Sequence, residues 1–284
     1  MRMPQKPPIY FCNGKYVPAD QTRISVHDLG LLRGFGLFES LRTYDRKPFL
    51  LKPHLERLFR GIRVISLKVP FSQETVSRII DRLIKMNDFE NALIRIILTG
   101  GPTSSLLPQE KPTMIVMVDP FHQFPAWQYE KGIALMTTHF FRIHPEIKTT
   151  VYFSAVMETV RAVRSGFHEA VYVDHRGAIL EGTTFNVFAV LPGPRLVTTE
   201  KGVLPGVTAA CVIKLAKRLK IPVQRNPISS TMLRRADELF ITSSNRELIP
   251  VIRVDKKRIG NGKPGVITRQ LHRTYRIWTF KEFH

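Results

Sequence analysis

Lys148 and Glu181 are two residues whose types and surroundings could do covalent chemistry together. Lys148 stands between a predicted strand and a predicted helix, and Tyr152 opens that helix four residues later. A lysine amine condenses with an aldehyde, and partial burial lowers the pKa of a lysine and makes it nucleophilic. Glu181 precedes a strongly apolar strand, where a carboxylate could keep a pyridine nitrogen protonated so that the ring accepts electrons. Taken singly, a lysine in this position is much more often a surface residue at a helix start, and Glu181 could be a turn glutamate.

Three further segments supply groups that bind phosphate. Residues 202–208 open a predicted helix, and backbone N–H groups at a helix N-terminus point at an incoming anion. Arg57 lies off the apolar stripe of its helix, and a guanidinium binds phosphate through paired hydrogen bonds. Ser243 and Ser244 follow a buried strand and add hydroxyl and N–H donors. Singly these are a helix cap, a solvated arginine and a plain loop. Combined with the lysine and the carboxylate, they predict pyridoxal 5'-phosphate (PLP) as the cofactor.

The sequence contains none of the common motifs of metal sites or hydrolases. The nine histidines form no His-Glu-x-x-His motif, and there is no Cys-x-x-Cys pair. A Gly-x-Ser-x-Gly elbow and a Walker-type phosphate loop are also absent. Cys12 and Cys211 lie in apolar runs, which is typical of reduced core thiols in a cytoplasmic protein. We therefore predict no metal site and a cytoplasmic location.

The net charge of +20 is the most unusual feature of the composition. Taken alone, a charge of this size suggests nucleic acid as a partner. Lysine and arginine are scattered along the whole chain, however, and the aromatic residues lie mostly in apolar runs, so we do not expect nucleic acid to bind. No apolar run approaches the roughly 20 residues of a membrane span, and the N-terminus has no signal-peptide core. The sequence predicts a soluble protein without a membrane partner.

The apolar patterning predicts strands and helices in both halves of the chain. A hairpin with a type I′ turn at Asn13-Gly14 is expected first. The other expected elements of the N-terminal half are helices from about Pro53 and from Ser72, and buried strands over 92–98 and 113–118, joined by a Gly/Pro/Ser-rich loop over 99–111. In the second half, apolar residues spaced three and four apart over 152–163 predict a helix that ends at Ser165-Gly166.

Residues 119–131 contain two prolines and few periodic apolar positions, which favours an interdomain linker. We therefore predict a small N-terminal domain over 1–120, a linker over 121–131 and a large C-terminal domain over 132–284. Strands and helices occur in both parts, so the predicted fold class is α/β (α+β) with two domains.

Taken in order, these segments resemble those of the class IV aminotransferases, a family that includes branched-chain aminotransferases, D-amino acid aminotransferases and aminodeoxychorismate lyases. The similarity runs from Asn13 to about Arg269, and six ordered matches are a much more specific signal than any one of them. The matching segments are Asp28 to Glu39 (DLGLLRGFGLFE), His54-Leu55-x-Arg57-Leu58, Ile147-Lys148, Glu181-Gly182, Leu204-Pro205-Gly206-Val207-Thr208 and Phe240-Ile241-Thr242-Ser243-Ser244-x-x-Glu247.

The resemblance implies PLP fold type IV, with a smaller α/β N-terminal domain, a larger C-terminal pseudo-barrel domain, and an active site completed by the second subunit of a homodimer. It implies that Lys148 forms a Schiff base with PLP and transfers the proton, and that Glu181 pairs with the pyridine nitrogen. The other implied cofactor-binding residues are Arg57, Tyr152, Val207, Thr208, Ser243 and Ser244. The implied substrate-binding residues are Arg33, Arg95 and Thr183.

The resemblance also predicts the reaction, a transfer of an amino group between an amino acid and a 2-keto acid. The Ser243-Ser244 loop resembles the D-amino acid branch, so D-amino acids are the favoured substrates. Arg33 and Phe35 depart from the tyrosine and aspartate that family members often have. Arg33 is thus either part of a carboxylate clamp with Arg95 or a loop cation at the dimer surface.

Three alternatives to this function stay open. Two share the fold: an aminodeoxychorismate lyase that releases pyruvate, and a branched-chain L-amino acid aminotransferase. The third is a basic nucleic-acid-binding protein on a decayed enzyme fold. The intact Lys148, Glu181 and Arg57 disfavour this last alternative.

Overall fold

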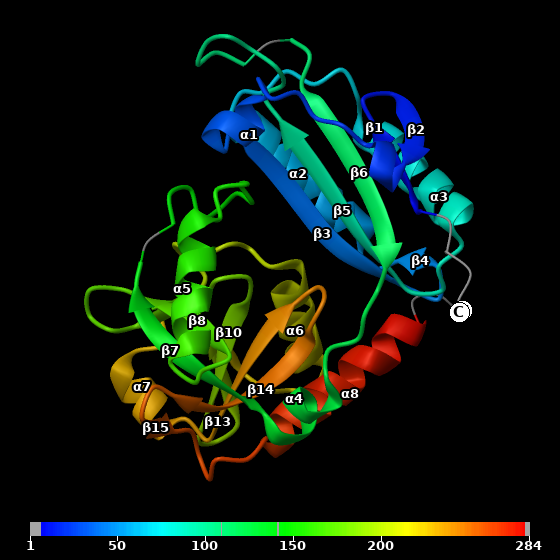
Figure 1. The fold of residues 1–284 in the computed structure, drawn as a ribbon. Coiled ribbons are helices and arrows are strands. Elements are labelled where there is room, and N and C mark those ends of the chain that lie inside the picture. Colours follow the sequence, from blue (N-terminus) through cyan, green and yellow to red (C-terminus); the bar gives the residue numbers. More distant parts are fainter. Residues whose placement is uncertain (1–6, 109, 141, 282–284) are drawn as a thin grey trace. The chain divides into compact units, whose positions relative to one another are not determined.

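The computed structural model describes residues 7–108, 110–140 and 142–281. The chain divides into two compact units (Figure 1). The first unit comprises Met1–His122 and Ile147–Val151, and the second comprises Gln123–Glu146 and Tyr152–His284. The short segment Ile147–Val151, which carries Lys148, therefore packs with the N-terminal unit, although the boundaries expected from the sequence assign it to the C-terminal domain.

The first unit is built on a six-stranded antiparallel sheet with the strand order β2-β1-β6-β5-β3-β4. Its strands are β1 (Ile9–Cys12), β2 (Lys15–Pro18), β3 (Gly36–Tyr44), β4 (Lys47–Pro48), β5 (Ala92–Thr99) and β6 (Thr113–Pro120). The predicted hairpin is confirmed, because Asn13 and Gly14 both have positive φ and join β1 directly to β2. The two predicted buried strands are confirmed as β5 and β6.

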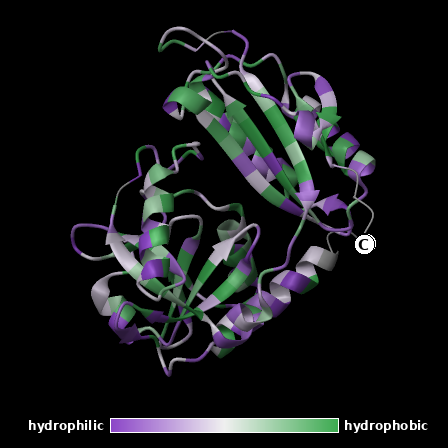
Figure 2. Cartoon of the chain, viewed as in Figure 1, coloured by the Kyte–Doolittle hydropathy of each residue, from purple (hydrophilic) through white to green (hydrophobic). Residues whose placement is uncertain are grey.

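Two amphipathic helices, α2 (Leu51–Val64) and α3 (Gln73–Asn87), pack with one face of this sheet in a single hydrophobic core. Because side chains alternate along a strand, Ile94, Ile96 and Leu98 of β5 are buried in that core, whereas Arg95 and Ile97 lie on the opposite face. Figure 2 shows β5 as largely hydrophobic. The shorter elements of this unit are the 3-10 turn η1 (Ala19–Gln21) and the helix α1 (Leu29–Arg33).

The second unit contains a nine-stranded sheet, six of whose strands close into a circle. Its strands are β7 (Ile133–His139), β8 (Glu169–Val173), β9 (Ile179–Gly182), β10 (Asn186–Leu191), β11 (Arg195–Thr198), β12 (Val223–Arg225), β13 (Glu238–Ser243), β14 (Glu247–Val254) and β15 (Lys257–Arg258). Pairing runs β10-β13-β14-β7-β8-β9 and returns to β10 through Glu181 and Asn186. This closure is the expected pseudo-barrel.

The helices of the second unit are α4 (Ala126–Lys131), α5 (Phe153–Arg164), α6 (Val207–Arg218), α7 (Ser230–Arg235) and α8 (Val266–Lys281). The predicted helix over 152–163 is present as α5, but its apolar stripe is largely exposed, and Ala162 is the one residue of α5 that is fully buried. The expected linker over 121–131 contains α4. No helix in the described part of the chain is long and apolar enough to cross a membrane.

Candidate active site

Lys148 lies on an extended segment that is bonded to the beginning of β3. The N–H of Phe38 donates to the carbonyl oxygen of Lys148 at 2.9 Å, and the N–H of Thr150 donates to the carbonyl oxygen of Gly36 at 2.9 Å. The hydroxyl of Thr150 also donates to the carbonyl oxygen of Gly34 at 2.8 Å. The backbone of the lysine is therefore held on both sides. Lys148 is half-buried, and its amine lies 4.3 Å from the centroid of the Phe38 ring.

Arg57 is buried in the first unit, although it lies off the apolar stripe of its helix. Its Nε donates to Glu39 Oε1 at 2.7 Å and its Nη2 to Glu39 Oε2 at 2.8 Å. His54, one turn earlier on α2, donates from Nδ1 to Glu39 Oε2 at 2.8 Å. The carboxylate of Glu39 on β3 thus explains why Arg57 can be buried, although the helical pattern places it outside the core.

Electrostatics fix the charges of this buried trio. Burial alone would raise the pKa of the Glu39 carboxyl, but the charge and hydrogen bonds of Arg57 outweigh it and hold the pKa well below its usual range. Burial lowers the pKa of His54 and, together with the positive charges of Arg57 and Lys148, outweighs the hydrogen bond and charge of Glu39, which raise it. At neutral pH the trio therefore consists of a carboxylate, a guanidinium and a neutral imidazole.

Glu181 is buried in the second unit and bound from two directions. Arg142 Nη1 donates to its Oε1 at 2.9 Å, and the N–H of Leu204 donates to its Oε2 at 3.0 Å. Burial raises the pKa of the neighbouring Tyr172 to about 12, with the charge of Arg142 acting in the opposite direction. Tyr152, the predicted partner of the cofactor's ring oxygen, is the N-cap residue of α5 and also acts electrostatically on Tyr172.

The N-terminus of α6 has the features of an anion site. Its N-cap residue is Gly206, which makes no side-chain cap, and among the described residues the N–H groups of Val207 and Thr208 have no hydrogen-bond partner. Both residues are buried. A Cβ on Gly206 would lie 1.9 Å from the side-chain oxygen of Asn186, so only glycine fits. Buried, unsatisfied N–H groups at the positive end of a helix dipole suit a phosphate.

The loop after β13 supplies further polar groups in the second unit. Ser243 Oγ accepts a hydrogen bond from the N–H of Arg246 at 3.3 Å, and Ser244 begins the turn to β14. The hydroxyl of Thr242 is buried and has no hydrogen-bond partner in the described part of the chain. Thr242 pairs in the sheet with Asn186, the residue whose side-chain oxygen lies beside Gly206. An unsatisfied hydroxyl here and the free N–H groups of α6 both fit a phosphorylated cofactor.

The three predicted substrate-binding residues lie on separate elements. Arg33 ends α1, is exposed and donates to the carbonyl oxygen of Leu32 at 2.9 Å. Arg95 donates to Asp119 Oδ2 at 3.1 Å, and the hydroxyl of Tyr10 binds the other oxygen of that carboxylate. The two arginines share no partner among the described residues. Thr183, in the second unit, donates to Glu169 Oε2 at 3.0 Å.

Sequence reasoning missed Glu39 and His54 as partners of Arg57, and Arg142 and Tyr172 as neighbours of Glu181. The first two lie in segments that match the family pattern, and the spacing of His54 and Arg57 along one helix was a usable signal. The second two had none, because each is brought to Glu181 by sheet pairing and loops rather than by proximity in sequence.

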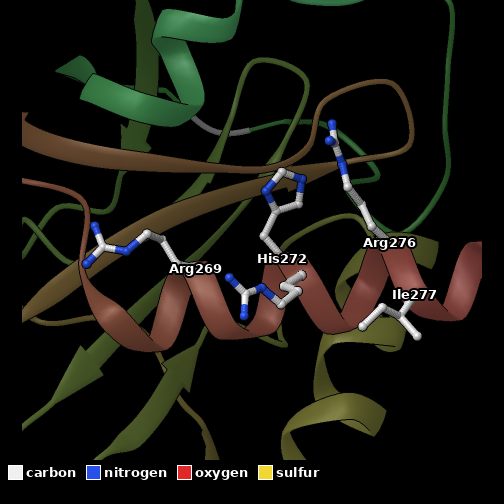
Figure 3. A pocket seen from close by; sticks show the side chains of 5 residues that line it. Arg269, His272, Arg276 and Ile277 are labelled. Atoms are coloured by element: carbon white, nitrogen blue, oxygen red, sulfur yellow. The ribbon is translucent and has the colours of Figure 1, made fainter.

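A separate pocket of about 340 Å³ lies along α8 (Figure 3). It is lined by Arg269, His272, Arg273, Arg276 and Ile277. None of these is a predicted site residue. In the described part of the chain, no group of three or more His, Cys, Asp and Glu side chains is arranged to hold a metal ion.

These groups suit an enzyme that attaches a phosphorylated aldehyde to a lysine. The chain belongs to the class IV aminotransferase family, because the family model for class IV amino-transferases matches residues 36–254. Enzymes of this family use PLP, and the chain is accordingly a PLP-dependent transaminase.

Similar proteins cover nearly the whole chain. The "Putative branched-chain-amino-acid aminotransferase" of Methanocaldococcus jannaschii is 33% identical over 275 residues, which is 94% of each chain. The D-alanine aminotransferase of Staphylococcus epidermidis is 30% identical over 272 residues, 93% of this chain and 95% of the relative.

Solved structures show the same fold, PLP fold type IV. The branched-chain amino acid aminotransferase of Escherichia coli superposes with a TM-score of 0.90 at 28% identity, covering 95% of this chain and 94% of the other. The branched-chain amino acid aminotransferase of T.th., solved with pyridoxamine 5'-phosphate, gives 0.91 at 27% identity, covering 96% and 94%.

Proposed function

We propose that Lys148 is the catalytic residue of this transaminase and that it binds PLP. The observation that carries the proposal is the half-buried Lys148, whose backbone is bonded to β3 and whose amine lies beside Phe38. When bound, PLP supplies the electron sink that makes the α-proton of an amino acid acidic. Lys148 Nζ would take the proton from the α-carbon as a base and, as an acid, deliver it to the carbon that was the cofactor's aldehyde carbon.

The other residues hold and tune the cofactor. Glu181, whose oxygens accept hydrogen bonds from Arg142 and the N–H of Leu204, is suited to binding a protonated ring nitrogen. Arg57, the N–H groups of Val207 and Thr208, Ser243 and Ser244 bind the phosphate. Tyr152 binds the ring oxygen.

The substrate we propose is an amino acid with an apolar side chain, together with the matching 2-keto acid. The amine of Lys148 contacts Phe38, which pairs with Ile97 on the face of the first sheet that is opposite to α2 and α3. Met117, on the neighbouring strand β6, lies on the same face. Both D-alanine and the branched-chain L-amino acids meet this requirement. The serine pair in the loop after β13 favours the D-amino acids, and the relatives include enzymes named for each substrate.

A homodimer in the cytoplasm completes the proposal. Val156, Val160 and Val163 leave an apolar stripe of α5 exposed on the single chain, which is typical of a subunit interface. The two free cysteines, Cys12 and Cys211, agree with a reducing compartment.

An absorbance spectrum of the purified protein tests the reaction. We expect a near-visible band from PLP bound to Lys148 that is lost in the Lys148→Ala variant. D-alanine, L-leucine and D-glutamate, added separately, should bleach the band only when the amino acid is a substrate, which also establishes its handedness. An unchanged spectrum in Lys148→Ala would contradict the assignment. Pyruvate release from aminodeoxychorismate without a keto acid acceptor would support the lyase instead.

A further inference from the structure

Glu39 is a fully buried carboxylate whose two oxygens both bind one guanidinium. The two hydrogen bonds from Arg57 measure 2.7 and 2.8 Å, and the side chain of Glu39 is 0% exposed. A buried ion pair is rarely more stabilising than apolar residues of the same volume, since both charges lose their hydration. Stability alone therefore does not explain why this pair occupies the core between β3 and α2.

We propose that Glu39 is a positioning residue that orients Arg57 toward the phosphate of the cofactor. The inference rests on the proposed role of Arg57 as a phosphate ligand. A guanidinium has five N–H donors in a rigid plane, and the two bonds to Glu39 set the orientation of that plane. A guanidinium that is already held in one orientation loses less conformational entropy when it binds an anion.

His54 supports the carboxylate from the same helix. It donates to Oε2, the oxygen that Nη2 of Arg57 also binds, and it carries no charge at neutral pH because burial lowers its pKa. The orientation of Glu39 is thus determined by two side chains of α2, and in turn determines that of Arg57.

Positioning and simple electrostatics predict opposite results when Glu39 is replaced by glutamine. The Glu39–Arg57 pair is neutral, so removing the negative charge makes the region more positive. If charge alone mattered, Glu39→Gln would bind a phosphate dianion more tightly. If orientation matters, the same variant binds the phosphate more weakly.

The experiment compares PLP with pyridoxal, which lacks the phosphate, on the full-length protein stripped of its cofactor. Absorbance titrations give both dissociation constants. The dissociation constant of pyridoxal divided by that of PLP measures how much the phosphate contributes to binding. We expect Glu39→Gln to reduce this ratio at least about tenfold, in the range of a charged hydrogen bond. Arg57→Gln should reduce it at least as much. Glu39→Asp, which keeps the charge on a shorter side chain, should show a smaller loss and serves if Glu39→Gln does not fold.

Glu238→Gln is the matched control. Glu238 is also a buried carboxylate, but it binds the N–H groups of Ile267 and Thr268 at the start of α8. Loss of stability alone should weaken the binding of both ligands and leave the ratio unchanged. An unchanged or larger ratio in both Glu39 variants, with a reduced ratio in Arg57→Gln, would overturn the positioning role and leave the proposed function intact. An unchanged ratio in Arg57→Gln would overturn the role of Arg57 itself.

Discussion

The guanidinium of Arg142 donates a hydrogen bond of 2.9 Å to the carboxylate of Glu181, which is buried, while the side chain of Arg142 is 14% exposed. The N–H of Leu204 binds the second oxygen of the same carboxylate. Glu181 is thus held in one orientation by the protein itself. Its position depends on a residue far away in the sequence that the family pattern does not include.

Replacing Arg142 by leucine should strongly destabilise the protein. The change leaves a buried carboxylate without its charged partner, which costs about 3 kcal/mol or more in the free energy of unfolding. The matched control is Arg46→Leu, which breaks a solvent-exposed pair with Asp88 and should cost much less, because water screens exposed ion pairs. Urea denaturation measures both. If the two variants lose equal stability, the buried pair does not contribute as proposed.

Glu247 should make the protein sensitive to acid. Its carboxylate accepts hydrogen bonds from His272 at 2.7 Å and Arg276 at 2.9 Å. Burial alone would raise its pKa, but these bonds outweigh burial and lower the pKa from 4.5 to about 2. A carboxyl with a lower pKa in the folded state stabilises the fold above its unfolded pKa, and this contribution disappears as the pH falls through the folded pKa.

The measurement is the urea midpoint at several pH values between about 4.5 and 2. We expect the stability difference between wild type and Glu247→Gln to be largest at the upper end of this window and to shrink toward the lower end. Glu200→Gln, which removes an exposed carboxylate, is the control. Parallel curves for wild type and Glu247→Gln would contradict the prediction.

Kinetics of an Arg95 variant should show whether Arg95 binds the carboxylate of the substrate. If its guanidinium binds the substrate carboxylate in place of Asp119, Arg95→Gln should raise KM for the amino acid about tenfold or more with little change in kcat. Asp119→Asn removes the competing carboxylate and should not raise KM. Steady-state kinetics with the amino acid that bleaches the absorbance band gives both values. Equal KM values in wild type and Arg95→Gln would show that the Arg95–Asp119 pair is structural only.

The exposed stripe of α5 should be covered by a second copy of the chain. Val156→Lys places a charge in the apolar contact, so we expect it to convert a dimer into a monomer, as measured by light scattering after size-exclusion chromatography. Val64→Lys on α2 introduces the same charge at a valine that is 47% exposed, against 58% for Val156, and should leave the assembly unchanged. A monomeric wild-type protein would show that the predicted homodimer is wrong.

Features that neighbouring residues determine were predictable from the sequence. Asn13 and Gly14 favour positive φ and therefore specify the tight hairpin. Ser72 accepts a hydrogen bond from the N–H of Thr75 at 3.2 Å and starts α3 where predicted. Lys148 and Glu181 were found as candidates because each stands next to a strong pattern of apolar residues.

Features that depend on distant partners were not predictable in this way. Helical periodicity counts Arg57 as polar and has no information about Glu39, which lies on a different element. The apolar stripe of α5 has the pattern of a core helix, although most of it is exposed on the single chain. The position of Ile147–Val151 depends on β3, which precedes it by more than a hundred residues.

That last segment limits how the protein can be divided. Because Ile147–Val151 belongs to the first unit and its flanking residues to the second, the chain passes from one unit to the other three times, after residues 122, 146 and 151. A fragment that ends at His122 would lack part of its own unit, and a fragment that begins at Gln123 would carry Lys148 without the strand that holds it. In a chimera of two relatives, the five residues around the lysine should therefore come from the parent that supplies 1–122. The two units therefore cannot be exchanged as simple N-terminal and C-terminal halves, because the lysine must be taken from the same parent as the N-terminal unit.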